Sequence, residues 1–207
     1  MKYILFGGPY MEDRTLSNLL IHLNIISITA SRENAVETQK LIKKTIENIR
    51  YKTARKGQIL MVKEELRAVS NLIDLYSLRF GDVFSYKVNI DAKCESIYVP
   101  HYSIMAFIEN SITHAYEEKE GLRELKLSIN EREGFIRILV SDNGLGFDYD
   151  SIRSDLAVLK KYGSIADIEQ RLCEYHGCKE TIEIKSQKNK GTDILILIPW
   201  QGEEYQL

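Results

Sequence analysis

The chain has 207 residues, with 28 Lys and Arg against 30 Asp and Glu, and therefore a formal net charge of −2. Hydrophobic residues make up 44% of it and there are only 12 Gly and 3 Pro, which excludes a disordered, collagen-like or low-complexity chain. A nearly neutral chain has no bulk electrostatic attraction for nucleic acid, so we expect no nucleic acid partner.

The cysteines Cys94, Cys173 and Cys178 are odd in number and form no CxxC motif. We therefore expect neither a disulfide scaffold nor a structural zinc site, and we expect a cytoplasmic location. No run of residues is long and uncharged enough to cross a bilayer, so attachment to a membrane would require a further segment upstream.

The first 80 residues favour helices, because their apolar residues recur at intervals of three and four. One apolar stripe runs from Leu16 to Ile26, and a second runs from Ala35 to Ile49. Between them, Asn34 with Glu37 is typical of a capping box. Two such helices cannot bury both stripes alone, so we expect a helical hairpin that forms a homodimer. Packing on the rest of its own chain is the alternative.

Residues 32–56 are locally basic, with eight Lys and Arg against three Glu, an excess of +5. This stretch is either a solvated helix face or a surface that docks an acidic partner. A third helix is predicted from Val62 to Tyr76, ending near Gly81.

Beyond Gly81 the apolar residues alternate, which is typical of half-buried strands. Strands are predicted near 84–90, 125–129, 136–140, 181–186 and 192–199. Helices are predicted from Pro100 to Glu118 and from Ser164 to Tyr175. This order predicts an α+β fold in which helices cover one face of a mixed or antiparallel sheet. We place the domain boundary at residue 81, with a helical region over 1–81 and a second domain over 82–207.

The helix after Pro100 carries the first group of candidate site residues. Glu109 and Asn110 are adjacent, and Asn110 shares a helix face with His114. On a largely apolar helix these polar groups need partners. The side-chain oxygen of an Asn suits Mg²⁺, which takes few protein ligands together with phosphate oxygens.

Two further segments carry glycines next to polar residues. Asp142 follows a strand and precedes Gly144 and Gly146, which allow the backbone to turn closely around a ligand. The Asp142 carboxylate can accept a hydrogen bond from an exocyclic amine such as that of adenine. Before the last strand, the run Lys190-Gly191-Thr192 offers a close backbone approach and a hydroxyl.

The order E-N-x-x-x-H, D-N-G-x-G and K-G-T resembles the GHKL ATPases, which share a Bergerat-type α/β sandwich, over about residues 83–199. The flanking runs Glu64-Glu65-Leu66 and Ile168 to Gly177 resemble the LytS/YesM-type sensor histidine kinases. The resemblance implies a protein of a two-component system that binds ATP with Mg²⁺, phosphorylates a histidine and passes the phosphoryl group to a response regulator.

The resemblance also implies a role for each candidate residue. Asn110 would be the Mg²⁺ ligand and Glu109 the general base or its polarising partner. Asp142 would bind the adenine amine. The remaining nucleotide-binding residues would be His114, Gly144, Gly146, Lys190, Gly191 and Thr192.

Two positions depart from the family pattern. Ser17 stands where the phosphoacceptor histidine is expected, and His22, the nearest candidate acceptor, lies five residues further along. Tyr162 and Ser164 stand at glycine positions of a second glycine motif. The alternatives are therefore a pseudokinase that binds nucleotide as a dimeric regulator, or a domain that keeps the fold but no longer binds ATP. A third possibility, that the protein hydrolyses ATP or phosphorylates a serine, is supported by fold analogy alone.

Overall fold

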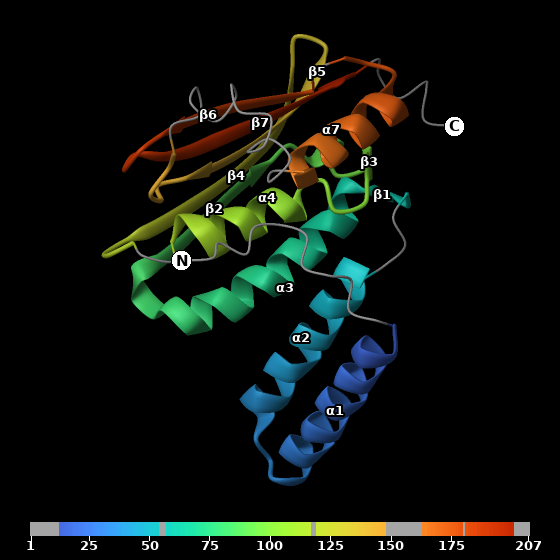
Figure 1. The fold of residues 1–207 in the computed structure, drawn as a ribbon, viewed down its shortest axis with the longest axis vertical. Helices are drawn as coiled ribbons and strands as arrows, with labels where there is room; N and C mark the ends of the chain where they lie inside the picture. The colour runs from blue at the N-terminus through green and yellow to red at the C-terminus, as the bar shows by residue number, and fades with distance from the viewer. Residues whose placement is uncertain (1–12, 54–56, 117–118, 148–162, 180, 201–207) are drawn as a thin grey trace.

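The computed structural model describes residues 13–53, 57–116, 119–147, 163–179 and 181–200. It begins with two antiparallel helices, α1 (Asp13–Arg32) and α2 (Val36–Thr53), which pack against each other at the end of the molecule remote from the sheet (Figure 1). The helical hairpin predicted for this region is confirmed.

The turn between α1 and α2 differs in detail from the prediction. Asn34 has a φ of +56° and therefore ends α1 in the left-handed conformation. The first helical hydrogen bond of α2 runs from the Gln39 N–H to the Ala35 carbonyl (3.0 Å), so Ala35 is the residue that precedes the helix. Asn is tolerated at positive φ, which explains why it serves the turn here and not a capping box.

A two-stranded ribbon and a long helix connect the hairpin to the sheet. β1 (Ile59–Met61) pairs with β3 (Tyr98–Pro100) in antiparallel fashion, and α3 (Val62–Phe80) follows β1 directly. The Glu64 carboxylate accepts a hydrogen bond from the Met61 N–H (2.9 Å) and so caps the start of α3. Both short strands were absent from the prediction, because three residues are too few to show an alternating pattern.

The central sheet is mixed and five-stranded, with the order β2-β4-β5-β7-β6. Only the β2–β4 pair is parallel. The strands are β2 (Phe84–Ile90), β4 (Arg123–Arg132), β5 (Phe135–Asp142), β6 (Ile182–Gln187) and β7 (Gly191–Pro199). Helices lie on one face of the sheet: α3, α4 (Met105–Asn110) and α7 (Gly163–His176) (Figure 1). The predicted α+β class is confirmed.

The core lies between the sheet and these helices. Alternate residues of the strands, such as Leu127, Ile138 and Ile196, are at most 1% exposed and face the helices. Val69 and Leu72 of α3 belong to the same apolar cluster. The proposed boundary at residue 81 thus falls after a helix that shares its core with the sheet.

The helix after Pro100 starts later than predicted. Pro100 ends β3, a turn spans residues 101–104, and α4 covers only Met105–Asn110. The chain then continues as a π-helix, η3 (Ser111–Ala115), directly after Asn110. Single π-helical turns are frequent at functional sites.

In the part of the chain that the structure describes, no helix is both long and apolar enough to span a membrane.

Candidate functional site

Asp142 ends β5 on the face of the sheet that the helices cover, and it is 8% exposed. Its carboxylate accepts hydrogen bonds from the Gly144 N–H at Oδ1 and from the Ser111 hydroxyl at Oδ2, both at 2.8 Å. Burial raises the pKa of Asp142, although these hydrogen bonds oppose the shift. The Thr192 backbone is a third donor to this carboxylate, whose two oxygens offer about four acceptor positions, so the carboxylate can still accept a hydrogen bond from a ligand amine.

Asn110 precedes, in the chain, a residue that contacts Asp142. Ser111, which donates to Asp142, follows Asn110 directly at the junction of α4 and the π-helix η3. The Asn110 side-chain oxygen Oδ1 is buried and has no hydrogen-bond partner among the described residues. A buried carbonyl oxygen without a partner costs free energy, so this atom suits a ligand or a cation.

Close backbone packing at this site requires glycine at three positions, Gly144, Gly146 and Gly191. A Cβ atom on Gly144 would overlap Ala115 in η3. Gly191 has a φ of +103°, and a Cβ atom there would overlap the backbone of Asp142. The loop after β5, which also contains Gly146, is therefore held against both η3 and the start of β7.

The third polar segment, Lys190-Gly191-Thr192, lies at the same edge of the sheet. Thr192 pairs with Asp142 across β5 and β7, is 8% exposed, and shares a hydrogen bond with the Ser186 hydroxyl (2.9 Å). A cavity of about 650 Å³ at this edge is lined by Asp142, Lys190, Gly191 and Thr192, and also by Lys126, Ser141, Lys185 and Asp193 from the other face of the sheet. Its size suits a small-molecule ligand.

Glu109 does not line this cavity and instead faces α2 and α3. The Lys52 ammonium of α2 forms an ion pair with its Oε1, and the Tyr102 hydroxyl donates a hydrogen bond to its Oε2. Burial and the neighbouring Glu109 charge raise the pKa of Tyr102, which keeps the hydroxyl protonated as a donor. Both oxygens of this candidate base are thus engaged by donors.

Two candidate residues of the described chain, Ser17 and His22, lie outside this site. Ser17 and His22 are exposed on α1, in the hairpin. The side chains of His114 and Ser164, and Tyr162 as a whole, lie outside the described residues.

The residues that are present fit a magnesium-bound nucleotide. A buried carboxylate, a partnerless Asn oxygen, and glycines that keep the backbone close to the cavity are the groups that a purine and a phosphate-bound cation require.

Some residues that build the site were not singled out from the sequence. Ser111 and Ser186 hold Asp142 and Thr192, and Lys52 and Tyr102 hold Glu109. The position of Ser111 next to Asn110 was the only signal for any of them, because the other contacts join distant segments.

No family model matches the chain. Among curated proteins, it is 28% identical over 155 residues to "Sensor protein LytS" of Bacillus cereus, covering 72% of this chain and 26% of that protein. It is 24% identical over 193 residues to "Sensor protein LytS" of Bacillus subtilis, covering 88% of this chain and 32% of that protein. The chain thus spans about a quarter to a third of the length of these relatives.

Among solved structures, the histidine kinase domain of a blue-light activated histidine kinase from Erythrobacter litoralis has a TM-score of 0.46 and 19% identity, covering 90% of this chain and 91% of that one. The catalytic domain of the histidine kinase ThkA has a TM-score of 0.48 and 18% identity, covering 69% and 94%. At these TM-scores the likeness carries no argument about function. On the sequence similarity to curated proteins, the chain is a homologue of the LytS sensor histidine kinases.

Proposed function

We propose that the chain binds ATP with Mg²⁺ and acts as a histidine-kinase-type signalling protein of a two-component system. The observation that supports the proposal is that Asp142, the glycine-bounded loop after β5 and Thr192 lie together at one edge of the sheet, and that Ser111, the neighbour of Asn110 in the chain, donates a hydrogen bond to Asp142. The homology to LytS sensor histidine kinases supports the same assignment.

In this proposal each residue has a task of its own. Asp142 accepts a hydrogen bond from the adenine amine, and Thr192 supplies a hydroxyl beside it. Asn110 directs its oxygen to the metal ion, and Lys190 and His114 lie with the phosphates. When bound, Mg²⁺ offsets the negative charge of the phosphate oxygens. For Glu109 to act as a base, the Lys52 ion pair must open first.

The proposed partners are a second copy of the chain and a response regulator. The helical hairpin supplies the dimer contact, and the cytoplasm is the proposed location. These assignments concern the whole sensor, of which the chain matches only a part.

A nucleotide titration tests the ATP assignment. Calorimetry with and without Mg²⁺ compares the wild type with Asn110→Ala and Asp142→Asn. We expect Asp142→Asn to weaken ATP binding about 10- to 100-fold at any Mg²⁺ concentration, because a charged hydrogen bond is lost. Asn110→Ala is expected to weaken binding only when Mg²⁺ is present.

Asp91→Asn is the matched control, because Asp91 is exposed, follows β2 at the end of the sheet remote from Asp142, and does not line the cavity. If the wild type and all three variants bind ATP equally, or if none of them binds it, the site assignment is wrong.

The second candidate is a pseudokinase, which Ser17 at the expected acceptor position favours. His22 lies five residues along α1, about 7.5 Å further on, and points about 140° away from Ser17. Ser17→His therefore offers a direct comparison. If the chain retains the rest of a kinase, this variant is expected to gain acid-labile phosphate from labelled ATP, whereas Ser17→Gln, its control, is not.

Labelling of the wild type that His22→Gln abolishes would contradict the pseudokinase and would identify His22 as the acceptor. Labelling in neither the wild type nor Ser17→His would contradict the kinase.

A further inference from the structure

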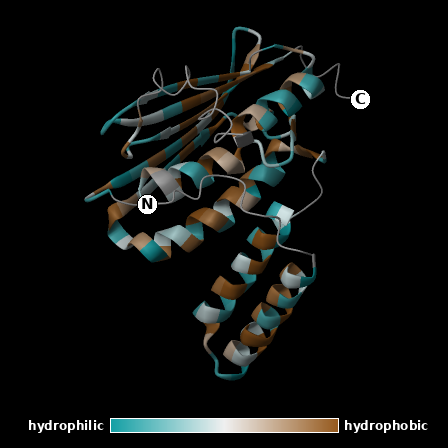
Figure 2. Ribbon diagram, viewed as in Figure 1, coloured by the Kyte–Doolittle hydropathy of each residue, from teal (hydrophilic) through white to brown (hydrophobic). Residues whose placement is uncertain are grey.

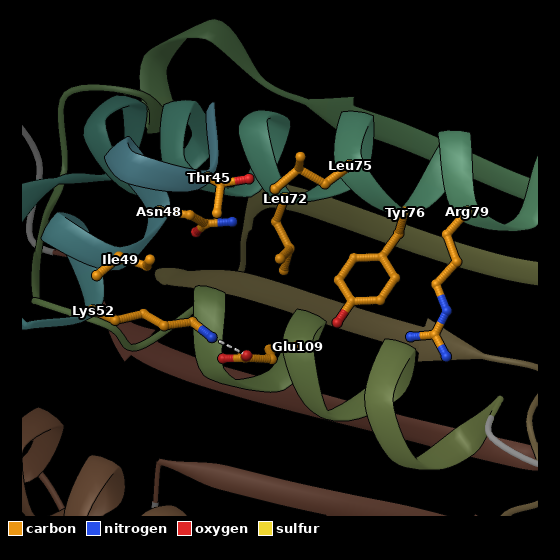
Figure 3. A pocket seen from close by; sticks show the side chains of 9 residues that line it. All are labelled: Thr45, Asn48, Ile49, Lys52, Leu72, Leu75, Tyr76, Arg79 and Glu109. Atoms are coloured by element: carbon orange, nitrogen blue, oxygen red, sulfur yellow. Dashed lines mark hydrogen bonds and ion pairs between the residues drawn. The ribbon is translucent and has the colours of Figure 1, made fainter. Parts of the chain in front are cut away.

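A second cavity, of about 390 Å³, lies where α2, α3 and α4 meet (Figure 3). Figure 3 shows Leu72 and Tyr76 of α3 along one wall, with Asn48 toward one end and Arg79 at the other. A cavity of this size with an apolar wall and a few converging polar groups is typical of a site for a small organic molecule. It is distinct from the cavity beside Asp142.

Asn48 places a polar group at this cavity that a ligand could contact. Its side chain is nearly buried, with 6% of the residue exposed, and it borders the cavity. The side-chain oxygen Oδ1 is buried and has no hydrogen-bond partner among the described residues. Leaving a buried carbonyl oxygen without a donor costs about 1–3 kcal/mol. An occupant with a hydroxyl or amide group would relieve this cost.

The charged residues around the cavity indicate the charge of a ligand that it could bind. Lys52 and Glu109 form an ion pair and neutralise each other. The Arg79 guanidinium lies over the rings of Tyr76 (5.8 Å) and Phe80 (5.2 Å), and within the described parts of the chain it forms no ion pair. The cavity therefore favours an anion.

We propose that this cavity binds a small organic anion, with a carboxylate on Arg79, a hydroxyl or amide group on Asn48, and an aromatic or aliphatic body against Leu72 and Tyr76. Leu72 precedes Arg79 by two helical turns, about 10.5 Å, which sets the length of the occupant. The occupant would lie against the Lys52–Glu109 pair, which joins α2 to the helix that carries Asn110. The proposal goes beyond nucleotide binding and does not depend on it.

The test uses 3-(4-hydroxyphenyl)propionate as the probe, because its phenol hydroxyl both donates and accepts. Binding to the full chain is followed by calorimetry and NMR in the absence of nucleotide, so a failed kinase assignment leaves the result unaffected. We expect saturable binding of the wild type, weakened about tenfold or more in Arg79→Gln because a charge-assisted hydrogen bond is lost. Arg50→Gln, at an exposed site of α2 that does not border the cavity, is the control and is expected to bind as the wild type does.

Asn48→Leu tests the other end of the cavity. An apolar residue of similar volume removes a buried polar group, so the variant is expected to keep its thermal midpoint. It should bind the probe and its analogue without the hydroxyl, 3-phenylpropionate, equally, whereas the wild type prefers the hydroxylated probe. The proposal is overturned if the wild type shows no saturable binding up to about 10 mM. Equal binding of the neutral amide of the probe, or wild-type affinity in Arg79→Gln, would overturn it too.

Discussion

Asp142 is a buried carboxylate held by hydrogen bonds from Gly144, Ser111 and the Thr192 backbone, although burial disfavours its charged form. A buried charge of this kind reduces stability and is the sort of cost that proteins carry at functional sites. The Gly144 N–H and the Ser111 hydroxyl orient the carboxylate before any ligand arrives, which lowers the ordering cost of binding.

Asp142→Asn is therefore expected to raise the thermal midpoint at neutral pH while it weakens nucleotide binding. The folded-state pKa of Asp142 is raised above its unfolded value, so the folded state takes up the proton first as the pH falls. The wild type thus carries a penalty above its folded-state pKa and regains that stability as the pH falls toward the unfolded value of about 3.9.

Thermal unfolding of both proteins between about pH 7 and pH 3.5 measures this difference. The midpoint gained by the Asn variant should shrink toward acid. A gain that is absent at pH 7, or that grows as the pH falls, would contradict the role assigned to burial.

At the scale of elements, the buried carboxylate of Glu65 fixes α3 against the start of α4. It is fully buried, and its Oε2 accepts hydrogen bonds from the N–H groups of Ile104 (3.0 Å) and Met105 (3.1 Å). Its Oε1 accepts hydrogen bonds from the Tyr51 hydroxyl and the Tyr102 N–H. One side chain of α3 thus satisfies the free N–H groups at the start of α4 and also contacts the end of α2.

Glu65→Ala should reduce the free energy of unfolding by about 3–5 kcal/mol, because several buried donors lose their acceptor together. Urea denaturation measures the effect. The neighbouring Glu64→Ala is the control: Glu64 caps only the Met61 N–H, and its loss is expected to cost about 1 kcal/mol. Equal losses in the two variants would show that Glu65 is an ordinary cap.

At the scale of the whole molecule, α1 leaves apolar residues without a partner. Ile21, Ile25 and Ile28 are 54–55% exposed and follow one another at helical spacing on the end of the molecule remote from the sheet. Figure 2 shows hydrophobic residues along this helix, where the described chain provides nothing but α2 to cover them. A second copy of the hairpin would bury this surface.

We expect the chain to be a dimer and Ile25→Glu to weaken the dimer about 100-fold or more, because each copy loses a buried isoleucine and gains a charge. Sedimentation equilibrium measures the association. Leu78→Glu, at an isolated exposed position of α3, is the matched control and should leave the dimer intact. A wild-type monomer at micromolar concentration would refute the dimer.

Much of the fold could be read from the spacing of apolar residues. Periods of three to four predicted the hairpin and the helix from Val62, and alternation predicted the five strands of the sheet, because each element buries one face on the core. The order of the three polar segments predicted that residues distant in the sequence come together in the second domain. Asp142, Gly191 and Thr192 are indeed in contact, and Ser111, the neighbour of Asn110, joins them.

Contacts between distant segments were decided only by the folded chain. Nothing local to Lys52 or Tyr102 distinguishes them from ordinary surface residues, and the run that contains Glu65 indicated a family but no contact, yet these residues hold Glu109 and the start of α4. The short β1–β3 ribbon and the cavity beside Asn48 arise in the same way. Periodicity reports which face of an element is buried, whereas hydrogen-bond partners and cavities depend on which elements meet, and that is settled by packing in three dimensions.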